Sequence, residues 1–193
     1  MGRARQRGGV RPTAHRVRDA LFNSLGARVE DAEVLDLYAG TGALGLEALF
    51  RGARAVVFVE RDPRLVAQIR ERVLAEGWQE RAQVWRAQVR IALRDLAEGG
   101  RRFDLILLDP PYGRGLLQET LVALAAGVLL RPGTRLVAEG HWREEPHTPP
   151  GFVCVRAARY GETGLWEFAA QQDTGGARTE EADRDDGDLP GEF

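Results

Sequence analysis

The stretch that decides the fold runs from Val34 to Phe50 and reads VLDLYAGTGALGLEALF. Its first five residues are nearly all apolar, which is typical of a strand that is covered on both faces of a parallel sheet. Gly40, Gly42 and Gly45 then follow at the spacing Gly-x-Gly-x-x-Gly, and a helical pattern covers residues 43–51. The sequence therefore predicts a strand, a glycine-rich turn and a helix, the arrangement that binds nucleoside cofactors.

Strands and helices continue to alternate after this unit. We expect strands at 55–60, near 84, at 103–109 and at 135–139, and helices at 63–75, 89–97 and 115–127. A helix that starts at an N-cap Thr13 and stops at Gly26 precedes them. Residues 152–159 and 165–169, joined by a turn at 160–164, indicate an antiparallel hairpin. The predicted fold class is α/β, a mostly parallel sheet with helices on both faces and a C-terminal hairpin.

Composition sets the class of protein. The chain has 193 residues, of which 44% are hydrophobic and 29% charged, and its net charge is −2. These values are typical of one soluble domain, and no apolar run approaches the roughly eighteen residues of a membrane span. We therefore expect a cytoplasmic monomer without membrane contact. Cys154 is the single cysteine and the three histidines are scattered, so we expect no disulfide and no metal.

The charges are distributed unevenly along the chain. Residues 1–18 hold six arginines and no acid, and residues 171–193 hold eight acids against two arginines. We divide the chain into a basic arm (1–12), a folded domain (13–170) and an acidic tail (171–193) that we expect to be disordered. The arm suits contact with nucleic-acid phosphates, although a solvated terminus would have the same composition.

Two acids near the glycine turn indicate which cofactor it binds. Glu60 ends the next predicted strand, twenty residues after Gly40, where a carboxylate can accept hydrogen bonds from ribose hydroxyls. Asp36 lies inside the first strand, where it would repel a pyrophosphate but attract the ammonium group of S-adenosylmethionine. Asp36 therefore favours this methyl donor. The glycines alone fit NAD equally well, or a tight turn that only needs glycine's freedom.

Asp109-Pro110-Pro111-Tyr112 follows the fourth predicted strand, at the edge where open parallel sheets bind ligands. A carboxylate and a backbone carbonyl there can accept both N–H bonds of a nucleobase amine and direct its lone pair at a sulfonium methyl group. The prolines fix the backbone that presents the carbonyl. Tyr112 can stack on a base that has been swung out of its surroundings. The alternative is an ordinary turn at a strand end.

Three stretches carry a resemblance to a known family: Arg11–Asn23 with its Arg-Pro-Thr opening, Val34–Ala48, and Phe103–Tyr112. From about Gly9 to Phe168 the sequence resembles the RsmD family of bacterial small-subunit (16S) rRNA guanine-N2 methyltransferases. The resemblance implies a Rossmann-like class I methyltransferase fold with seven strands and S-adenosylmethionine as the cofactor. It also implies a guanine N2 amine as the methyl acceptor, and ribosomal RNA or a small-subunit particle as the partner.

The resemblance also implies roles for individual residues. The catalytic residues would be Asp109, Pro110, Pro111 and Tyr112. The cofactor would be held by Asp36, Tyr38, Gly40, Gly42, Gly45, Glu60, Arg61, Gln88 and Asp109. The substrate RNA would meet Arg11, Thr13, Arg16, Arg18, Asn23, Tyr112 and Arg114. Gln88 stands where the family usually has an acid, but its amide oxygen can still accept a bond from the adenine amine.

Other functions stay open on the sequence. A DNA adenine-N6 methyltransferase can use the same Asp-Pro-Pro-Tyr loop, although such enzymes usually carry an extra segment that recognises DNA. A non-catalytic ribosome-assembly factor could keep the fold, but it would have no need of Asp109 and Tyr112. An NAD enzyme is disfavoured by Asp36. The preferred interpretation is the RNA methyltransferase.

Overall fold

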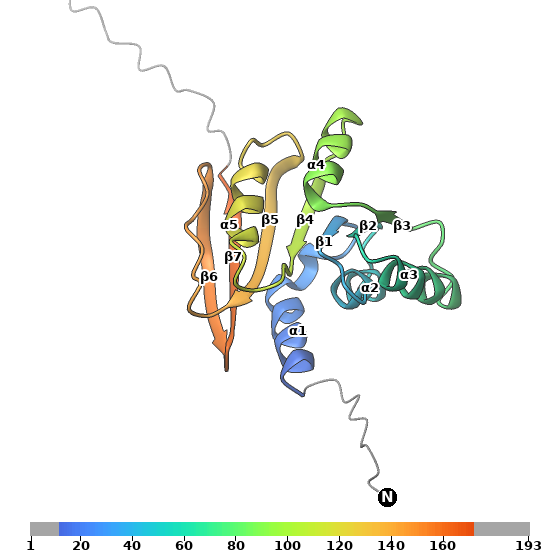
Figure 1. Cartoon of the computed structure of the whole chain (residues 1–193), viewed down its shortest axis with the longest axis horizontal. Coiled ribbons are helices and arrows are strands. Elements are labelled where there is room, and N and C mark those ends of the chain that lie inside the picture. Colours follow the sequence, from blue (N-terminus) through green and yellow to red (C-terminus); the bar gives the residue numbers. More distant parts are fainter. Residues whose placement is uncertain (1–11, 172–193) are drawn as a thin grey trace, which may run out of the picture.

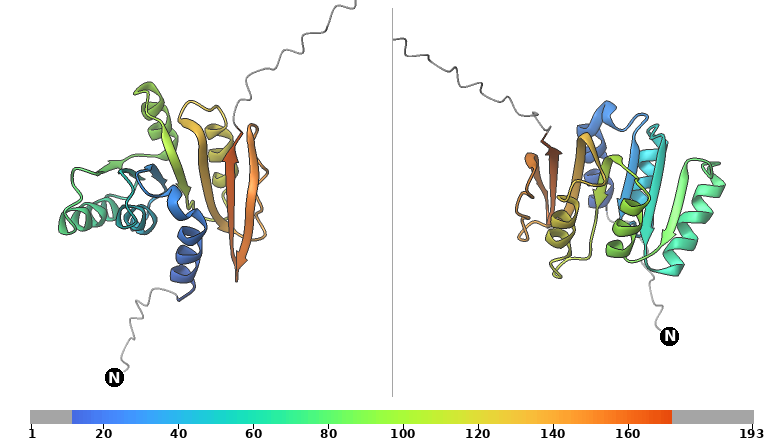
Figure 2. Two further views of the ribbon diagram at one scale, coloured as in Figure 1. Left: turned by 180° about the vertical axis from the view of Figure 1, so that it is seen from behind. Right: turned by 90° about the horizontal axis from the view of Figure 1, so that it is seen from above.

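The computed structural model describes residues 12–171 as a single α/β sheet with helices on both faces (Figures 1 and 2). The helices are α1 (Pro12–Leu25), α2 (Ala43–Phe50), α3 (Pro63–Ala75), α4 (Val89–Glu98) and α5 (Leu116–Leu124), with a 3-10 turn η1 (Gly26–Arg28). The strands are β1 (Glu33–Leu37), β2 (Ala55–Glu60), β3 (Ala82–Arg86), β4 (Phe103–Leu108), β5 (Leu130–His141), β6 (Phe152–Tyr160) and β7 (Thr163–Ala170).

The seven strands have the order β3-β2-β1-β4-β5-β7-β6. The first five are parallel, and β7 pairs antiparallel with both β5 and β6. This confirms the predicted fold class, including the C-terminal antiparallel hairpin. The direction of the strand order reverses between β1 and β4, and ligands bind outside the carboxyl ends of the strands at such a switch point.

Two apolar layers hold the helices against the sheet. Successive residues of β1 and β2 point to opposite faces, as the strand period of two requires. Val34, Val56 and Phe58 pack with residues of α1, α2 and α3 on one face, and Leu35 and Val57 pack with residues of α4 and α5 on the other. The central strands are therefore buried on both sides, which explains their nearly continuous apolar sequences.

The structure corrects the predicted start of the first helix. Helix α1 begins at Pro12, so Thr13 lies inside its first turn and is not the N-cap. Proline suits the first helical position because its φ is fixed and its missing N–H would have no partner there. The predicted end is confirmed, since the helix stops at Leu25 and Gly26 takes a φ of +53°.

Three other elements differ from the prediction by more than one residue. Helix α5 ends at Leu124, because the backbone turns there and Gly127 N–H binds the Leu124 carbonyl at 3.0 Å. Strand β5 is longer than predicted and runs from Leu130 to His141, supported by the Thr134 hydroxyl, which donates to the Phe103 carbonyl at 2.7 Å. The hairpin turn is only two residues long, since β6 ends at Tyr160 and β7 starts at Thr163.

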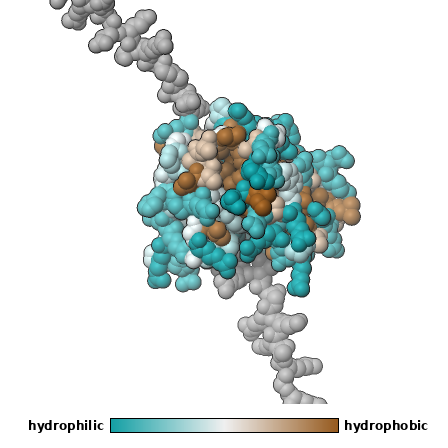
Figure 3. All heavy atoms as spheres, turned by 45° about the horizontal axis from the view of Figure 1, so that its top comes forward, coloured by the Kyte–Doolittle hydropathy of each residue, from teal (hydrophilic) through white to brown (hydrophobic). Residues whose placement is uncertain are grey.

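The surface is largely hydrophilic on the face shown in Figure 3, with apolar residues near its upper centre and at its right-hand edge. Within residues 12–171 no helix is long and apolar enough to cross a membrane. Residues 1–11 and 172–193, which include most of the predicted basic arm and acidic tail, lie outside the described residues.

Candidate functional site

The glycine turn after β1 is built from backbone that few residues other than glycine adopt. Tyr38, Gly40 and Gly42 have φ values of +59°, +56° and +78°. Tyr38 is not a glycine, so this conformation costs free energy, and such strain clusters at functional sites. The turn is closed by Gly42 N–H, which donates to the Ala39 carbonyl at 2.7 Å.

Gly45 and Asp36 fix the start of α2 behind this turn. The Asp36 Oδ2 atom accepts the Gly45 N–H at 2.9 Å, and Asp36 is only 1% exposed. A Cβ atom on Gly45 would lie 2.8 Å from Phe58 Cζ and 2.9 Å from Asp36 Oδ2, so only glycine fits between strand and helix. Asp36 therefore has a structural role that the sequence did not predict. Its contact with a cofactor ammonium group stays a prediction.

Glu60, at the end of β2, is tied to the same turn. Its Oε2 atom accepts the Gly40 N–H at 2.9 Å, and its Oε1 atom accepts the N–H groups of Arg61 and Asp62, each at 2.8 Å. These three bonds orient the carboxylate at the carboxyl edge of the sheet. Each carboxylate oxygen has two acceptor sites, so Glu60 can still accept from a ligand hydroxyl.

A cavity of about 860 Å³ opens at the carboxyl ends of β1, β2 and β4 and extends between α4 and α5. Its lining includes these predicted site residues: Tyr38, Gly40, Glu60, Arg61, Gln88, Asp109, Pro110, Pro111 and Tyr112. Its size falls in the range of small-molecule sites. The structure thus brings most of the predicted cofactor and catalytic residues to one cavity, whereas Asp36, Gly42 and Gly45 lie behind the turn rather than in its lining.

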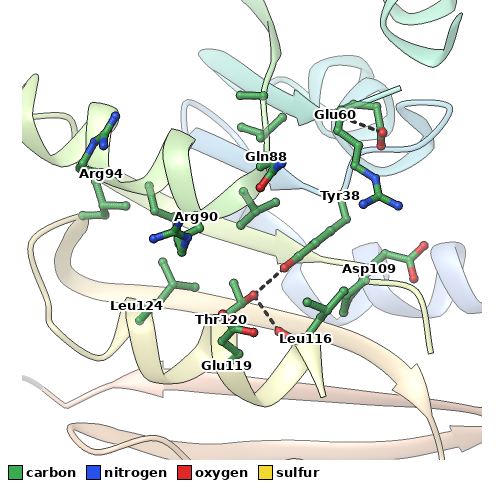
Figure 4. A pocket seen from close by; sticks show the side chains of 18 of the residues that line it. Tyr38, Glu60, Gln88, Arg90, Arg94, Asp109, Leu116, Glu119, Thr120 and Leu124 are labelled. Carbon is green, nitrogen blue, oxygen red and sulfur yellow. Dashed lines mark hydrogen bonds between the residues drawn. The ribbon is translucent and has the colours of Figure 1, made fainter. Parts of the chain in front are cut away.

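Tyr38 crosses the cavity toward α5, with Glu60 and Gln88 on one side and Asp109 on the other (Figure 4). The Tyr38 hydroxyl lies 2.8 Å from Thr120 Oγ1, which itself donates to the Leu116 carbonyl at 2.7 Å. Tyr38 is therefore the donor in the first of these bonds. Thr120 was not predicted as a site residue, because nothing in its local sequence indicates a partner 82 positions away.

The Asp109–Tyr112 loop leaves β4 at the switch point. Asp109 N–H faces the Leu37 carbonyl of β1 at 3.4 Å, and the loop is held from outside by Glu144, which accepts Gly113 N–H at 3.2 Å. Tyr112 is 46% exposed, and its ring meets that of His141 edge-on at 6.1 Å between centroids. An accessible tyrosine ring beside a carboxylate is thus available to a base at this edge.

Negative charge is concentrated around the cavity. The pKa of Asp36 is raised to about 7, chiefly by burial and also by the charges of Asp109 and Glu60, while the Gly45 hydrogen bond lowers it. Asp109 is open to the cavity, but the surrounding protein limits its solvation and raises its pKa. The pKa of Glu139 is also raised, by burial and by the charge of Asp109. Such a cluster favours a cationic ligand.

Some of the residues predicted to contact RNA are exposed, whereas others interact with neighbouring side chains. Arg11 lies outside the described residues, and Arg16 and Arg114 are exposed. Arg18 Nε lies 3.6 Å from Glu47 Oε2, and Asn23 accepts a long bond from Arg51 at 3.4 Å. Arg18 and Asn23 therefore join α1 to α2, and every RNA contact in this set stays a prediction.

A group of residues that the sequence did not single out lies beside Tyr112. The ring of His141 stacks on Trp142 at 6.3 Å, and the guanidinium groups of Arg143 and Arg159 lie 4.9 Å and 3.6 Å from the Trp142 ring centre. We call Trp142, Arg143 and Arg159 the aromatic rim. Glu139 was also missed, although its position at a strand end is the signal that identified Glu60 and Asp109.

Among residues 12–171, no group of three or more histidine, cysteine, aspartate or glutamate side chains is arranged to hold a metal ion. The arrangement as a whole combines an acidic cavity, a strained glycine turn and an exposed tyrosine at one edge of the sheet. It can hold a cationic nucleoside and present it to a second, planar ligand.

Comparison with known proteins places this site in a family. The family described as "Conserved hypothetical protein 95" matches residues 3–169. "Ribosomal RNA small subunit methyltransferase D" of Escherichia coli K12 is 43% identical over 113 residues, which cover 58% of this chain and 55% of that protein. The Haemophilus influenzae Rd protein of the same name is 30% identical over 154 residues, which cover 79% of each.

Solved structures agree with this assignment. A conserved hypothetical protein of Streptococcus pyogenes superposes with a TM-score of 0.73 at 30% identity, covering 80% of this chain and 95% of that one. An RNA methyltransferase from Salinibacter ruber, in complex with S-adenosyl-L-homocysteine, has the same fold, with a TM-score of 0.62 at 18% identity over 81% of this chain and 91% of that one. This chain therefore belongs to the RsmD family, to which its sequence motifs pointed.

Proposed function

We propose that this protein transfers a methyl group from S-adenosylmethionine to the N2 amine of a guanine in small-subunit ribosomal RNA. The observation that supports this most is the meeting of two loops at one cavity. The glycine turn with Glu60 and the Asp109–Tyr112 loop both line it. The names of the relatives, ribosomal RNA small subunit methyltransferases, support the RNA as the substrate. Guanine N2 as the acceptor rests on the family resemblance of the sequence.

The cofactor is S-adenosylmethionine, and the residues present fit it. Glu60 is oriented by three backbone bonds and keeps one acceptor position for a ribose hydroxyl. Asp36, Asp109 and Glu139 have raised pKa values, so their ionised forms gain from a nearby cation such as a sulfonium or an ammonium group. A phosphate-bearing dinucleotide would instead meet this negative charge and be repelled.

The chain's own residues position the acceptor amine. When bound, S-adenosylmethionine supplies a methyl group whose bond to sulfur breaks with both electrons left on sulfur. The Asp109 carboxylate and the Pro110 carbonyl accept the two N–H bonds of the amine and turn its lone pair toward that methyl group. The proton that the methylated nitrogen then releases passes to Asp109. Tyr112 stacks on the base and holds it in the plane that this geometry needs.

The aromatic rim supports RNA as the partner. Arginine and tryptophan side chains that are stacked on each other offer both a charge for a phosphate and a flat surface for a base. Trp142 and Arg159 flank the active site next to Tyr112, through His141. The rim therefore suits the nucleotides that neighbour the target guanine.

The activity is tested with methyl-labelled S-adenosylmethionine. The protein is incubated separately with small ribosomal subunits, naked 16S rRNA and duplex DNA, and the methylated nucleoside is identified after digestion. N2-methylguanosine from either RNA sample supports the proposal. N6-methyladenosine from DNA would replace it with the DNA adenine alternative, and no product from any sample would favour a non-catalytic assembly factor.

Replacing Glu60 with alanine is expected to weaken S-adenosylmethionine binding at least tenfold. A charged hydrogen bond contributes about 1.5–3 kcal/mol, and the alanine variant also releases the Gly40 N–H that shapes the turn. Calorimetry measures the dissociation constant, and circular dichroism checks that the variant is folded. Unchanged affinity in a folded variant would refute the assignment of Glu60 to the ribose.

The aromatic rim is tested by replacing Trp142 or Arg159 with alanine. We expect each variant to bind small-subunit RNA about 5- to 100-fold more weakly, because base stacking is worth about 1–3 kcal/mol. Only Arg159→Ala should also lower the slope of log affinity against log salt, by about 0.7–0.9 per lost phosphate contact. Arg64→Ala, an exposed arginine at the start of α3, serves as the control. Equal salt slopes for Arg159→Ala and the wild type would rule out a phosphate contact there.

A further inference from the structure

Glu139 is a partly buried acid that has no ion-pair partner among the described residues. It lies near the end of β5, one residue beyond Ala138, which pairs with Leu108 of β4. Glu139 and Asp109 therefore lie side by side at the carboxyl edge of the sheet. Among residues 12–171, none of the ion pairs within 4.0 Å includes Glu139. Burying a carboxylate without a cationic partner is costly, so its presence at the active site calls for a function.

Glu139 does not itself line the cavity, but it lies near two residues that do, Asp109 and Tyr112. The Glu139 carboxyl and the Thr163 hydroxyl are close enough to the Tyr112 hydroxyl to shift its pKa, and the charge of Asp109 raises the pKa of Glu139. Thr163 is close because it pairs with His141 in the antiparallel ladder of β5 and β7. A carboxyl group has about four acceptor positions, so an interaction with Tyr112 leaves others free. At least one oxygen of Glu139 therefore remains available to a ligand.

The sheet order separates the two ligands. Glu60 ends β2 and the glycine turn follows β1, so both lie on one side of Asp109, while Glu139 lies on the other side, on β5. With the cofactor held by Glu60 and the turn, an acceptor base that meets Asp109 and Tyr112 has its remaining edge toward β5. Glu139 is thus the charged group placed to meet the rest of that edge.

We propose that Glu139 is the specificity-determining residue for guanine, whose N1–H it accepts while Asp109 and the Pro110 carbonyl hold the N2 amine. This inference rests on the proposed function. Guanine is the standard base that has an N–H at N1 beside an amine at C2. Adenine presents a lone pair at N1, which a carboxylate repels. Glu139 therefore selects guanine by attracting its N1–H and by rejecting bases that lack it.

Positioning of Tyr112 is the competing role for Glu139. If the carboxyl did nothing but hold the Tyr112 hydroxyl, its removal would slow the reaction with every acceptor equally. Recognition of N1–H, in contrast, changes the ratio of rates between two acceptors that differ at N1. The ratio therefore distinguishes recognition from positioning, whatever the absolute loss of rate.

The experiment uses two substrates made by RNA ligation and assembled into small-subunit particles. One carries guanine at the nucleotide that the wild type methylates, and the other carries 2-aminopurine, which keeps the C2 amine but has a lone pair at N1. Single-turnover rates are measured with labelled S-adenosylmethionine for the wild type and for Glu139→Gln. The glutamine N–H₂ group can donate to the lone pair at N1 of 2-aminopurine, which the glutamate carboxylate repels.

We expect the wild type to prefer guanine by at least about 100-fold, because a site built for a polar group rejects a base that leaves it unpaired. Glu139→Gln should lower this preference at least about tenfold. Its rate with guanine should fall by about 10- to 100-fold, which is the effect of losing one charged hydrogen bond. Tyr112→Phe, which removes the hydroxyl near Glu139, should leave the ratio unchanged. Glu162→Gln, an exposed acid in the hairpin turn, controls for the loss of one negative charge.

The outcomes separate this inference from the proposed function. If the wild type produces no N2-methylguanine, the proposed function fails. If the wild type methylates guanine but Glu139→Gln keeps the wild-type ratio, Glu139 only positions Tyr112 and the inference is overturned. A ratio that falls equally in Tyr112→Phe would overturn it as well, since the tyrosine would then carry the selection.

Discussion

Asp109→Ala is expected to lower the single-turnover rate of methyl transfer by about 10²–10³, the usual loss for one preorganised electrostatic partner of a reacting group. The reason is geometric. The backbone of Asp109 is held at the switch point by the adjoining ends of β1 and β4, which places its carboxylate at the edge where the amine arrives. An amine whose lone pair is delocalised into the ring gains most from such preorganisation.

The asparagine variant separates hydrogen-bond acceptance from charge. Asp109→Asn keeps an oxygen acceptor and should retain more activity than Asp109→Ala, although the amide cannot take the proton that the product releases. Both variants should bind S-adenosylmethionine, because its proposed contacts come mainly from the glycine turn and Glu60. Rates at saturating cofactor test this order, and an alanine variant with near wild-type rate would exclude Asp109 from the chemistry.

Local sequence signals predicted the elements that carry the site. The helix at 63–75 has the predicted bounds, because Asp62 caps it by accepting the Arg64 N–H and Pro63 occupies its first turn. The glycine spacing and the Asp109–Tyr112 loop were recognised for the same reason, since each is specified by adjacent residues. Features of this kind depend on residues that are only a few positions apart, so they can be predicted without knowing the order of the strands.

Features that depend on distant residues were missed. The Tyr38–Thr120 bond joins positions 82 apart. Glu139 lies near Tyr112 only because β5 lies between β4 and β7 in the sheet. The strained φ of Tyr38 has no sequence signal either, because tyrosine rarely adopts it. Asp36 was identified by its charge, but the sequence could not reveal that Gly45 and Phe58 would bury it.

The burial of Asp36 leads to the second large effect. Its pKa is raised from 3.8 to about 7, so the folded protein binds a proton that the unfolded chain releases between these values. The contribution of Asp36 to stability is therefore fully present below pH 3.8 and is lost as the pH rises through about 7. The whole change is on the order of 4 kcal/mol, at 1.36 kcal/mol per pKa unit.

Asp36→Asn removes this dependence while keeping an acceptor for the Gly45 N–H. We expect the difference in unfolding free energy between Asp36→Asn and the wild type to grow in favour of asparagine as the pH rises from 4 to 8, by up to about 4 kcal/mol. Burying the amide N–H₂ group adds a cost that is the same at every pH. The test is therefore how the difference in unfolding free energy changes with pH, not its absolute value. Urea unfolding without cofactor at pH 5, 6, 7 and 8 measures it.

The same substitution should weaken S-adenosylmethionine binding. The buried Asp36 carboxylate destabilises the free protein, and the positive charge of the cofactor offsets this cost in the wild type but not in the asparagine variant. We expect the loss at pH 8 to exceed the loss at pH 5.5, where the wild-type carboxyl is itself protonated. S-adenosylhomocysteine lacks the sulfonium charge and should be affected less at either pH. If the stability difference stays constant from pH 5 to 8, Asp36 does not ionise in this range, and the preference of the site for a cationic cofactor must come from Asp109.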